Sequence, residues 1–205
     1  MDGVLIDSGA HHREAWRALL DELGVVPARP DYWRLTIGRP ANEAVGLLLG
    51  RPLSWAEAMR LADRKHDHYR RLACNGLPAV RGVTAFLDEV ATASIPRAVA
   101  TSASRGDVDR LLGRLGLRAL FDAVVTAEDV RLGKPDPEVY LLAAEGIGVP
   151  PGECLVFEDS VVGVQAARRA CMRVIGVATA HTGDELRAAG AASVIDDFEG
   201  LHWPA

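Results

Sequence analysis

The sequence predicts an α/β protein with a doubly wound, Rossmann-like parallel sheet and a smaller helical unit inserted near its start. From Ala79 onward, short apolar runs alternate with helical patterns, which is typical of parallel strands joined by helical crossovers. The stretch from Ser8 to Leu77 shows only helical spacing of apolar residues. The chain has 205 residues, enough for such a core and one modest unit. We therefore expect residues 1–7 and 78–205 to form the core and residues 8–77 a helical cap.

The helical unit contains three segments with start or stop signals. Gly24 and Gly50 each follow an apolar-periodic stretch, and glycine commonly follows the last helical residue. Ser54 is placed to cap the third segment. The predicted helices are His12–Leu23, Asn42–Leu49 and Ser54–Leu72. Three tryptophans of this unit are expected to anchor its packing: Trp16, Trp33 and Trp55.

The core is predicted as βα units in chain order. Its expected strands are Arg97–Thr101, Ala123–Thr126, Cys154–Phe157 and Arg173–Ala178. Its expected helices are Val108–Leu115, Glu138–Glu145, Val161–Ala170 and Gly183–Ala189. Two linkers should join the units, Asp7–Ala10 and Leu77–Gly82, and the second contains a proline and a glycine suited to a hinge.

Composition narrows the class of protein. The net charge is -5 and the basic residues are dispersed, which argues against a nucleic-acid partner. No apolar run approaches the roughly 20 residues of a membrane span, and the start lacks a signal-peptide pattern. The three cysteines show no CxxC spacing, which favours reduced thiols. We expect a cytoplasmic protein without a membrane partner, a monomer or weak homodimer.

Polar side chains follow the predicted strands. Thr101 and Ser102 end one strand, Glu158 and Asp159 end another, and Lys134 lies in a Gly-Lys-Pro-Asp-Pro loop. Two further acidic positions follow strand ends, Asp2 and the pair Glu128-Asp129. Ligands of doubly wound sheets bind at the carboxyl ends of the strands. Taken singly, each residue could be a helix cap or turn residue. Together they suit a phosphate held through Mg²⁺, which prefers carboxylate and phosphate oxygens.

Four strings, MDGVLIDS, AVATSAS, GKPDP and VFEDSVVGVQAA, resemble the signature motifs of the haloacid-dehalogenase superfamily. The helical block is similar to the cap of its β-phosphoglucomutase and phosphoglycolate-phosphatase branch. The resemblance covers almost the whole chain. It implies a magnesium-dependent phosphatase that acts on a small phosphorylated metabolite such as a sugar phosphate.

The resemblance also implies roles for individual residues. Asp2 would be the general acid/base, and its main-chain carbonyl would help to hold Mg²⁺ with Glu158 and Asp159. Lys134 would pair with the phosphoryl group, which Ser102 or Thr101 would also bind, with Ser102 favoured. In the cap, Lys65 would contact the substrate, His12 would lie beside the acid/base, and Arg39 would stand in for an arginine of the mutase pattern in a shifted register. For Lys65 a solvated helix lysine is an equal alternative.

Other features leave alternatives open. The shifted register of Arg39 favours a phosphatase over a β-phosphoglucomutase-type phosphomutase. Cys171 stands where the family usually has glycine, and Gly9-Ala10-His11 replaces the usual cap entry. A metal-independent haloacid dehalogenase is disfavoured by Asp2 and the Glu158-Asp159 pair. A truncated, non-catalytic phosphate-binding relative is the alternative from another class.

The family motif DxDGV implies one more feature. Met1 would occupy its variable middle position, so the nucleophilic aspartate that forms the aspartyl-phosphate would be the residue before Met1, at the end of an apolar strand. That strand would lie between the strands near Val99 and Val156. We therefore expect the chain as given to be inactive and the active protein to extend upstream.

Overall fold

The computed structural model describes residues 1–27 and 29–204. The α-helices are α1 (Gly9–Glu22), α2 (Ala41–Leu49), α3 (Trp55–Leu72), α4 (Val83–Thr92), α5 (Arg105–Arg114), α6 (Glu138–Gly146), α7 (Val161–Arg169) and α8 (Gly183–Ala189). The strands are β1 (Ala98–Ala100), β2 (Ala123–Val125), β3 (Leu155–Glu158), β4 (Arg173–Val177) and β5 (Ser193–Ile195). Four short 3₁₀ helices are η1 (Tyr32–Thr36), η2 (Arg118–Leu120), η3 (Ala127–Asp129) and η4 (Pro151–Glu153).

The α/β class with parallel strands and flanking helices is confirmed. All predicted strands and helices are present with shifted ends, and α4 and β5 are additional. The single predicted sheet is wrong for this chain, because the described strands form two sheets, β1-β2 and β3-β4-β5, all with parallel pairing. No described strand lies between β1 and β3.

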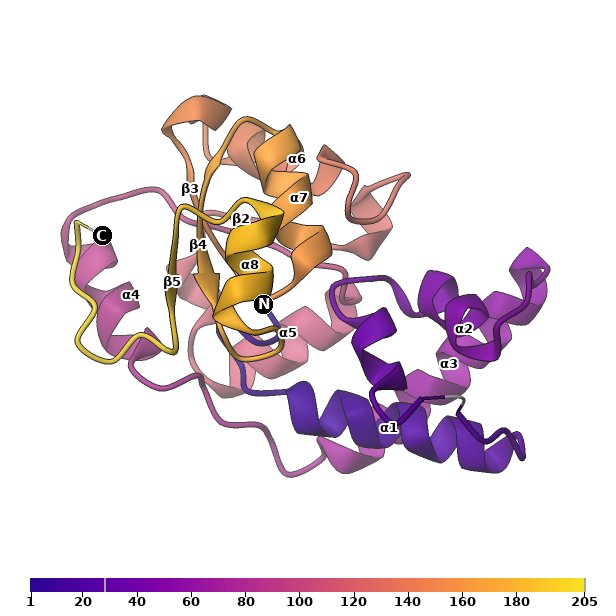
Figure 1. Cartoon of the computed structure of the whole chain (residues 1–205). Helices are drawn as coiled ribbons and strands as arrows, with labels where there is room; N and C mark the ends of the chain where they lie inside the picture. The colour runs from indigo at the N-terminus through magenta and orange to yellow at the C-terminus, as the bar shows by residue number, and fades with distance from the viewer. Residues whose placement is uncertain (28, 205) are drawn as a thin grey trace.

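The helices α1, α2 and α3 lie together to one side of the strands (Figure 1). Their shared apolar cluster includes Trp16, Leu19, Val45 and Leu61. The Ser54 side chain caps α3 as predicted, with Glu57 N donating to its Oγ over 3.3 Å. The expectation for the tryptophans is wrong for Trp55, which is 75% exposed.

The two predicted linkers run side by side. Asp7 N donates to Pro78 O over 2.9 Å, and Val80 N donates to Leu5 O over 3.0 Å. Ile6, fully buried, forms an antiparallel bridge with Ala79. Both passages between the helical unit and the strands therefore lie at one place, next to the first residues of the chain.

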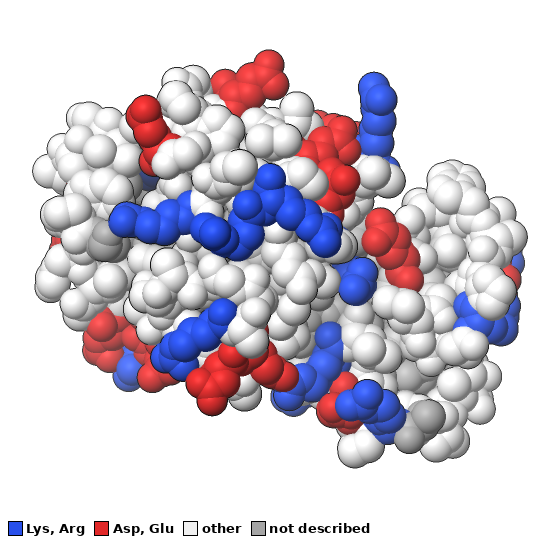
Figure 2. Space-filling view, turned by 45° about the horizontal axis from the view of Figure 1, so that its top comes forward, with Lys and Arg blue, Asp and Glu red and all other residues white. Residues whose placement is uncertain are grey.

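The surface carries mixed charge. On the face shown in Figure 2, Lys and Arg form one row across the larger unit, with Asp and Glu on both sides of that row. Within the part of the chain that the structure describes, no helix is both long and apolar enough to cross a bilayer. Cys74, Cys154 and Cys171 are free thiols.

Candidate active site

The carboxyl ends of β1 and β3 open onto a cavity of about 360 Å³ between the strands and the helical unit. Thr101 follows β1, Glu158 ends β3, and Asp159 comes next. The Met1–Gly3 turn and the loop before α6 add side chains from the same edge, and α1 and α3 face them (Figure 1). The residues to which the resemblance gives a role all line this cavity: Asp2, His12, Arg39, Lys65, Thr101, Ser102, Lys134, Glu158 and Asp159. The expectation is wrong for the Glu128-Asp129 pair, which is not part of the lining, because Glu128 accepts from Arg105 N and Asp129 accepts from Thr126.

Glu158 accepts hydrogen bonds with both carboxylate oxygens. Its Oε2 accepts from Lys134 Nζ (3.0 Å) and from Tyr140 OH (2.7 Å). Its Oε1 accepts from the Ser160 main-chain N (3.0 Å) and from Ser160 Oγ. Burial would raise the pKa of Glu158, but the Lys134 charge and these bonds hold it below its ordinary value. Glu158 is therefore an ionised partner that fixes the Lys134 ammonium.

Asp159 differs sharply from its neighbour. It is buried (8% exposed), and its carboxylate accepts no hydrogen bond from the residues described. It lies against the main chain of Gly3, which has φ +67°, and a Cβ at Gly3 would come within 2.0 Å of Asp159 Oδ2. Burial, followed by the Glu158 charge, raises the pKa of Asp159 well above its ordinary value. A buried carboxylate without a partner needs a cation to stay ionised.

Asp2, His12 and Lys65 form a hydrogen-bonded chain across the cavity. Lys65 Nζ lies 2.8 Å from His12 Nδ1, and His12 Nε2 lies 3.1 Å from Asp2 Oδ1. A lysine ammonium can only donate, so His12 is neutral with its proton on Nε2, which donates to Asp2. The ring of His12 stacks on Tyr69 with centroids 4.1 Å apart. The helical unit thereby holds the Asp2 carboxylate in one orientation.

The charge states in this chain follow from burial and contact. Burial would raise the pKa of Asp2, but the hydrogen bonds from His12 and Ser8 and the nearby positive charges lower it below its ordinary value. Burial also lowers the pKa of Lys65 to about 8. Lys65 is only 3% exposed, so the solvated-lysine alternative is wrong. The cavity therefore presents an ionised carboxylate and, at neutral pH, a buried cation.

The two hydroxyl groups after β1 are used differently. Ser102 Oγ donates to Gly38 O of the helical unit over 3.0 Å. Thr101 Oγ1 accepts from Ala103 N over 3.1 Å, which leaves its own proton free for another acceptor. Arg39 lines the helical side of the cavity. No hydrogen bond of its guanidinium to another described residue occurs.

Sequence reasoning missed several contributors. Ser8 Oγ donates to Asp2 Oδ1 over 2.6 Å. Ser160 caps α7 by accepting from Gly163 N (3.0 Å), so its cap signal directly after Glu158-Asp159 could have identified it. Tyr140 sits on an apolar helix face where nothing distinguishes it from a core tyrosine. Arg13, whose guanidinium lies 5.1 Å from the ring centroid of Trp33, also lines the cavity.

The donor set fits one hard cation. Among residues 1–27 and 29–204, no cluster of three or more His, Cys, Asp or Glu side chains could hold a metal. Mg²⁺ binds through one or two carboxylates and completes its shell with water and phosphate oxygens. The unpartnered Asp159 carboxylate beside Asp2 meets that requirement. A closed site for Zn²⁺ would need more protein ligands.

The chain is similar to known proteins over most or all of its length. Residues 1–170 match the family model of the haloacid dehalogenase-like hydrolases. The chain is 34% identical to validoxylamine A 7'-phosphate phosphatase of Streptomyces hygroscopicus subsp. limoneus, covering 100% of this chain and 94% of that protein. It is 35% identical to the phosphorylated carbohydrates phosphatase of Thermotoga maritima, covering 98% and 94%. The solved β-phosphoglucomutase of Clostridium difficile superposes with a TM-score of 0.86 at 26% identity, covering 98% and 90%.

Proposed function

Because the chain belongs to the haloacid dehalogenase-like hydrolases, we propose that it is a magnesium-dependent phosphatase of small phosphorylated metabolites, with sugar phosphates as the first choice. One observation carries the proposal. A fixed lysine, a free hydroxyl, an unpartnered buried carboxylate and an oriented Asp2 converge in one cavity. Phosphoryl transfer depends mainly on such positioning and on neutralisation of charge.

In this proposal the phosphoryl group lies between Lys134, Thr101 and Asp159. Lys134 neutralises one phosphoryl oxygen, and its position is fixed by Glu158. Thr101 is preferred over Ser102 as the hydroxyl donor, because the Ser102 proton is already donated to Gly38 O. Mg²⁺, held by the Asp159 carboxylate and the main-chain carbonyl of Asp2, would neutralise the remaining phosphoryl oxygens. Glu158 acts by positioning Lys134 and not as a metal ligand, because both of its carboxylate oxygens already accept hydrogen bonds.

Asp2 has the role of general acid/base. In its ionised state it can accept a proton from water during hydrolysis. A bound phosphoryl group adds negative charge nearby, which favours the protonated carboxyl and allows Asp2 to donate a proton to the leaving group. His12 acts as a positioning residue, since its Nε2 proton fixes the orientation of Asp2.

The nucleophile is the remaining requirement. Asp2 is held by Ser8 and His12, Glu158 is held by four donors, and Asp159 is the metal ligand of the proposal. Asp7 is exposed and its main chain is paired with Pro78, beyond the turn at Gly3. From the resemblance of Met1-Asp2-Gly3-Val4 to the DxDGV motif, we propose that an aspartate directly before Met1 supplies the nucleophile for an aspartyl-phosphate.

The substrate would lie under the helical unit, residues 8–77, which we propose is a cap. Its side of the cavity is lined by three basic residues, Lys65, Arg39 and Arg13. We therefore expect the leaving group, the alcohol that is released from the phosphate ester, to be polar or anionic. The relatives named as phosphatases of phosphorylated carbohydrates and of validoxylamine A 7'-phosphate support a sugar-like leaving group. The two cap cations Lys65 and Arg39 also suit a second phosphate, which keeps a phosphomutase as the second candidate.

The test is release of inorganic phosphate from p-nitrophenyl phosphate and from a panel of sugar mono- and bisphosphates. The 205-residue chain and a chain with its natural upstream residues are each assayed with MgCl₂ and with EDTA. We expect magnesium-dependent turnover by the extended chain, reduced about 10²–10³-fold by Thr101→Val, as for loss of one charge-stabilising donor. Thr92→Val on the exposed face of α4 is the matched control. A phosphomutase would instead isomerise a sugar phosphate without releasing phosphate, and a non-catalytic relative would bind phosphate without turnover.

A further inference from the structure

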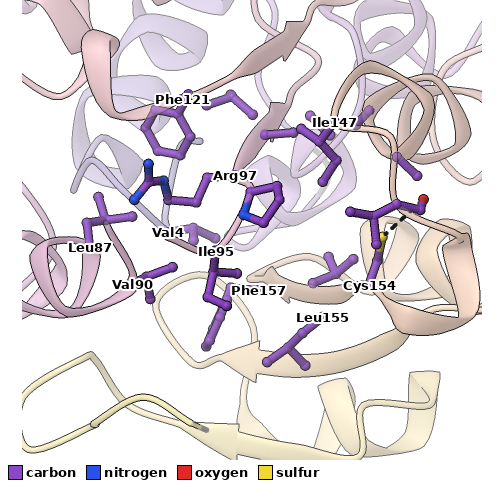
Figure 3. Close-up of a pocket in the computed structure, with 18 of the residues that line it drawn as sticks. Val4, Leu87, Val90, Ile95, Arg97, Phe121, Ile147, Cys154, Leu155 and Phe157 are labelled. Carbon is purple, nitrogen blue, oxygen red and sulfur yellow. Dashed lines mark hydrogen bonds between the residues drawn. The ribbon is translucent and has the colours of Figure 1, made fainter. Parts of the chain in front are cut away.

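Tyr140 lies between an apolar part of the core and the active site. It belongs to the first turn of α6 and is 4% exposed. Its side chain lines an apolar cavity of about 290 Å³ between the two sheets, whose other walls include Leu87, Val90 and Phe157 (Figure 3). Its hydroxyl reaches Glu158, which lines the active-site cavity. A residue that only filled an apolar wall would need no hydroxyl, so the hydroxyl indicates a role at the active site.

Tyr140 contacts the ion pair of Lys134 and Glu158 through both its hydroxyl and its ring. The hydroxyl donates to Glu158 Oε2 over 2.7 Å, and Lys134 Nζ donates to the same oxygen over 3.0 Å. The ammonium also lies 4.9 Å from the centroid of the Tyr140 ring, close enough for the ring face to attract a cation. Burial and the Glu158 charge raise the pKa of Tyr140 well above its ordinary value, so the hydroxyl remains a donor. The three buried side chains therefore form a closed triangle of contacts.

The ring contact limits the directions in which Lys134 can donate. A lysine has a flexible four-carbon stem, and its ammonium carries three N–H donors. One hydrogen bond to Glu158 fixes a distance but leaves the ammonium free to turn about that bond, and the Tyr140 ring supplies the second fixed contact. Among the described residues, Glu158 is the one hydrogen-bond acceptor of Lys134 Nζ. The remaining N–H groups are therefore left for a ligand in the cavity that Lys134 lines.

The hydroxyl limits how strongly Glu158 holds that ammonium. Because Oε2 accepts from both Tyr140 and Lys134, its negative charge is shared between two donors. Without the hydroxyl, Lys134 would be the sole donor to Oε2, and the ion pair would compete more strongly with a phosphoryl oxygen for the ammonium. We propose that Tyr140 is a positioning residue, whose ring and hydroxyl together direct the Lys134 ammonium to the phosphoryl group. This inference rests on the proposed function, in which Lys134 neutralises that group.

The position of the ammonium can be measured directly by NMR. The chain contains two lysines, Lys65 and Lys134, so isotope labelling of lysine alone gives one set of Hε signals for each. We expect the face of the Tyr140 ring to shift the Lys134 signals upfield. Tyr140→Phe keeps the ring and should keep this shift, whereas Tyr140→Leu should abolish it and leave the Lys65 signals in place. Lys134→Met, which retains the Lys65 signals alone, assigns the two sets.

Turnover tests whether this position matters in the reaction. In the extended chain, Tyr140→Leu should lower kcat/KM for p-nitrophenyl phosphate by about 10–100-fold, as when a group is misplaced by about 1 Å. Tyr140→Phe loses one hydrogen bond and should lower it by about 3–10-fold. Val139→Ala is the matched structural control, because Val139 is 3% exposed in the same helix and lines neither cavity. Tyr32→Phe removes a hydroxyl outside the active-site cavity, and both controls should leave kcat/KM unchanged.

The outcomes separate this inference from the proposed function. Lys134 signals that are the same in the parent and in Tyr140→Leu would overturn the inference, as would an equal fall of kcat/KM in Tyr140→Leu and Val139→Ala. If Tyr140→Leu does not fold, Tyr140→Phe decides, and an unchanged kcat/KM in that variant would overturn the inference. Failure of the proposed function has a different result: the Lys134 signals would respond to Tyr140→Leu, but the extended parent would release no phosphate.

Discussion

Glu158 and Asp159 are adjacent carboxylates in one cavity, yet their surroundings predict opposite effects on stability. We consider Glu158→Gln and Asp159→Asn, which preserve shape and remove charge. Glu158 accepts four hydrogen bonds, one of them from the buried Lys134 ammonium. Its replacement leaves an unpaired buried cation and places an amide NH₂ against other donors. Asp159 has no described hydrogen-bond partner, and its replacement removes a buried carboxyl group whose ionised form is already disfavoured without a cation.

The magnitudes follow from burial. Breaking a buried ion pair by removing one partner costs about 3–5 kcal/mol of unfolding free energy, so Glu158→Gln should lower Tm by roughly 6–20 °C at about 2–4 °C per kcal/mol. Asp159→Asn should leave the metal-free protein unchanged or slightly more stable, because burial and the Glu158 charge already disfavour the ionised carboxylate, while the amide that replaces it is an equally unpartnered polar group. Bound Mg²⁺ at 100 times its Kd should add about 2.7 kcal/mol, and only Asp159→Asn should abolish this gain.

The assay is thermal and urea unfolding of both variants and the parent chain, each in EDTA and in MgCl₂. The measured quantities are Tm, the free energy of unfolding and the magnesium-induced shift. The roles assigned to the two carboxylates are wrong if Glu158→Gln is as stable as the parent and loses the magnesium shift, or if Asp159→Asn is strongly destabilised and keeps it. Either result would make Glu158 the metal ligand and Asp159 the structural partner.

Two further predictions concern Lys65 and Cys171. Because burial lowers the pKa of Lys65 to about 8, against about 10.4 for a free lysine, the buried cation is present below pH 8 and is lost above it. The KM for an anionic substrate should therefore rise above about pH 8 in the extended enzyme, and Lys65→Arg, which stays charged, should remove that rise. An unchanged KM profile in Lys65→Arg would count against the assignment. Cys171 has φ +62°, a conformation that costs a non-glycine residue roughly 1–2 kcal/mol, partly offset by the backbone entropy of glycine. Cys171→Gly should raise the free energy of unfolding by about 0.5–1 kcal/mol, whereas Cys74→Gly, at an exposed residue without positive φ, should not; equal effects in urea unfolding would contradict this.

Much of the fold could be predicted because its signals are local. Ser54 caps α3 and Gly50 ends α2, as their residue types indicate. The α4 helix also had a local signal, with Val83, Phe86 and Val90 buried at helical spacing, although we did not predict it. The β5 strand is three residues long, which is too short for a periodic pattern to show. The division into two sheets could not follow from local patterns, because strand neighbours are a property of the assembled chain.

The site was predictable as a set of residues and less so as a set of roles. Residues at carboxyl ends of parallel strands must meet, so Thr101, Lys134 and Asp159 were expected in one place. Which carboxylate keeps free oxygens depends on donors from elsewhere, such as Tyr140 on α6. Likewise, the helical periodicity of α3 could not show whether the Lys65 side chain points to solvent or into the cavity. Its contacts with Trp16 and His12 place it in the cavity.

The last prediction concerns the tie between the helical unit and the core. Arg34 Nη2 donates to both oxygens of Glu185 at the start of α8, with 2.6 Å to Oε1. Both side chains are partly exposed, and exposed pairs contribute about 0.2–1 kcal/mol. Glu185 also caps α8 through Thr182, so Arg34→Ala is the cleaner perturbation.

If this pair holds the cap over the active-site cavity, Arg34→Ala in the extended enzyme should raise KM by up to about fivefold, which corresponds to 1 kcal/mol. The difference in KM between the parent and the variant should become smaller from low salt to 0.5 M NaCl, because salt screens exposed ion pairs. Arg29→Ala, which removes an exposed pair with Asp31 inside the helical unit, is the matched control and should leave KM unchanged. A KM equally insensitive to both substitutions would mean that other contacts, such as Ser102 to Gly38, hold the cap in place.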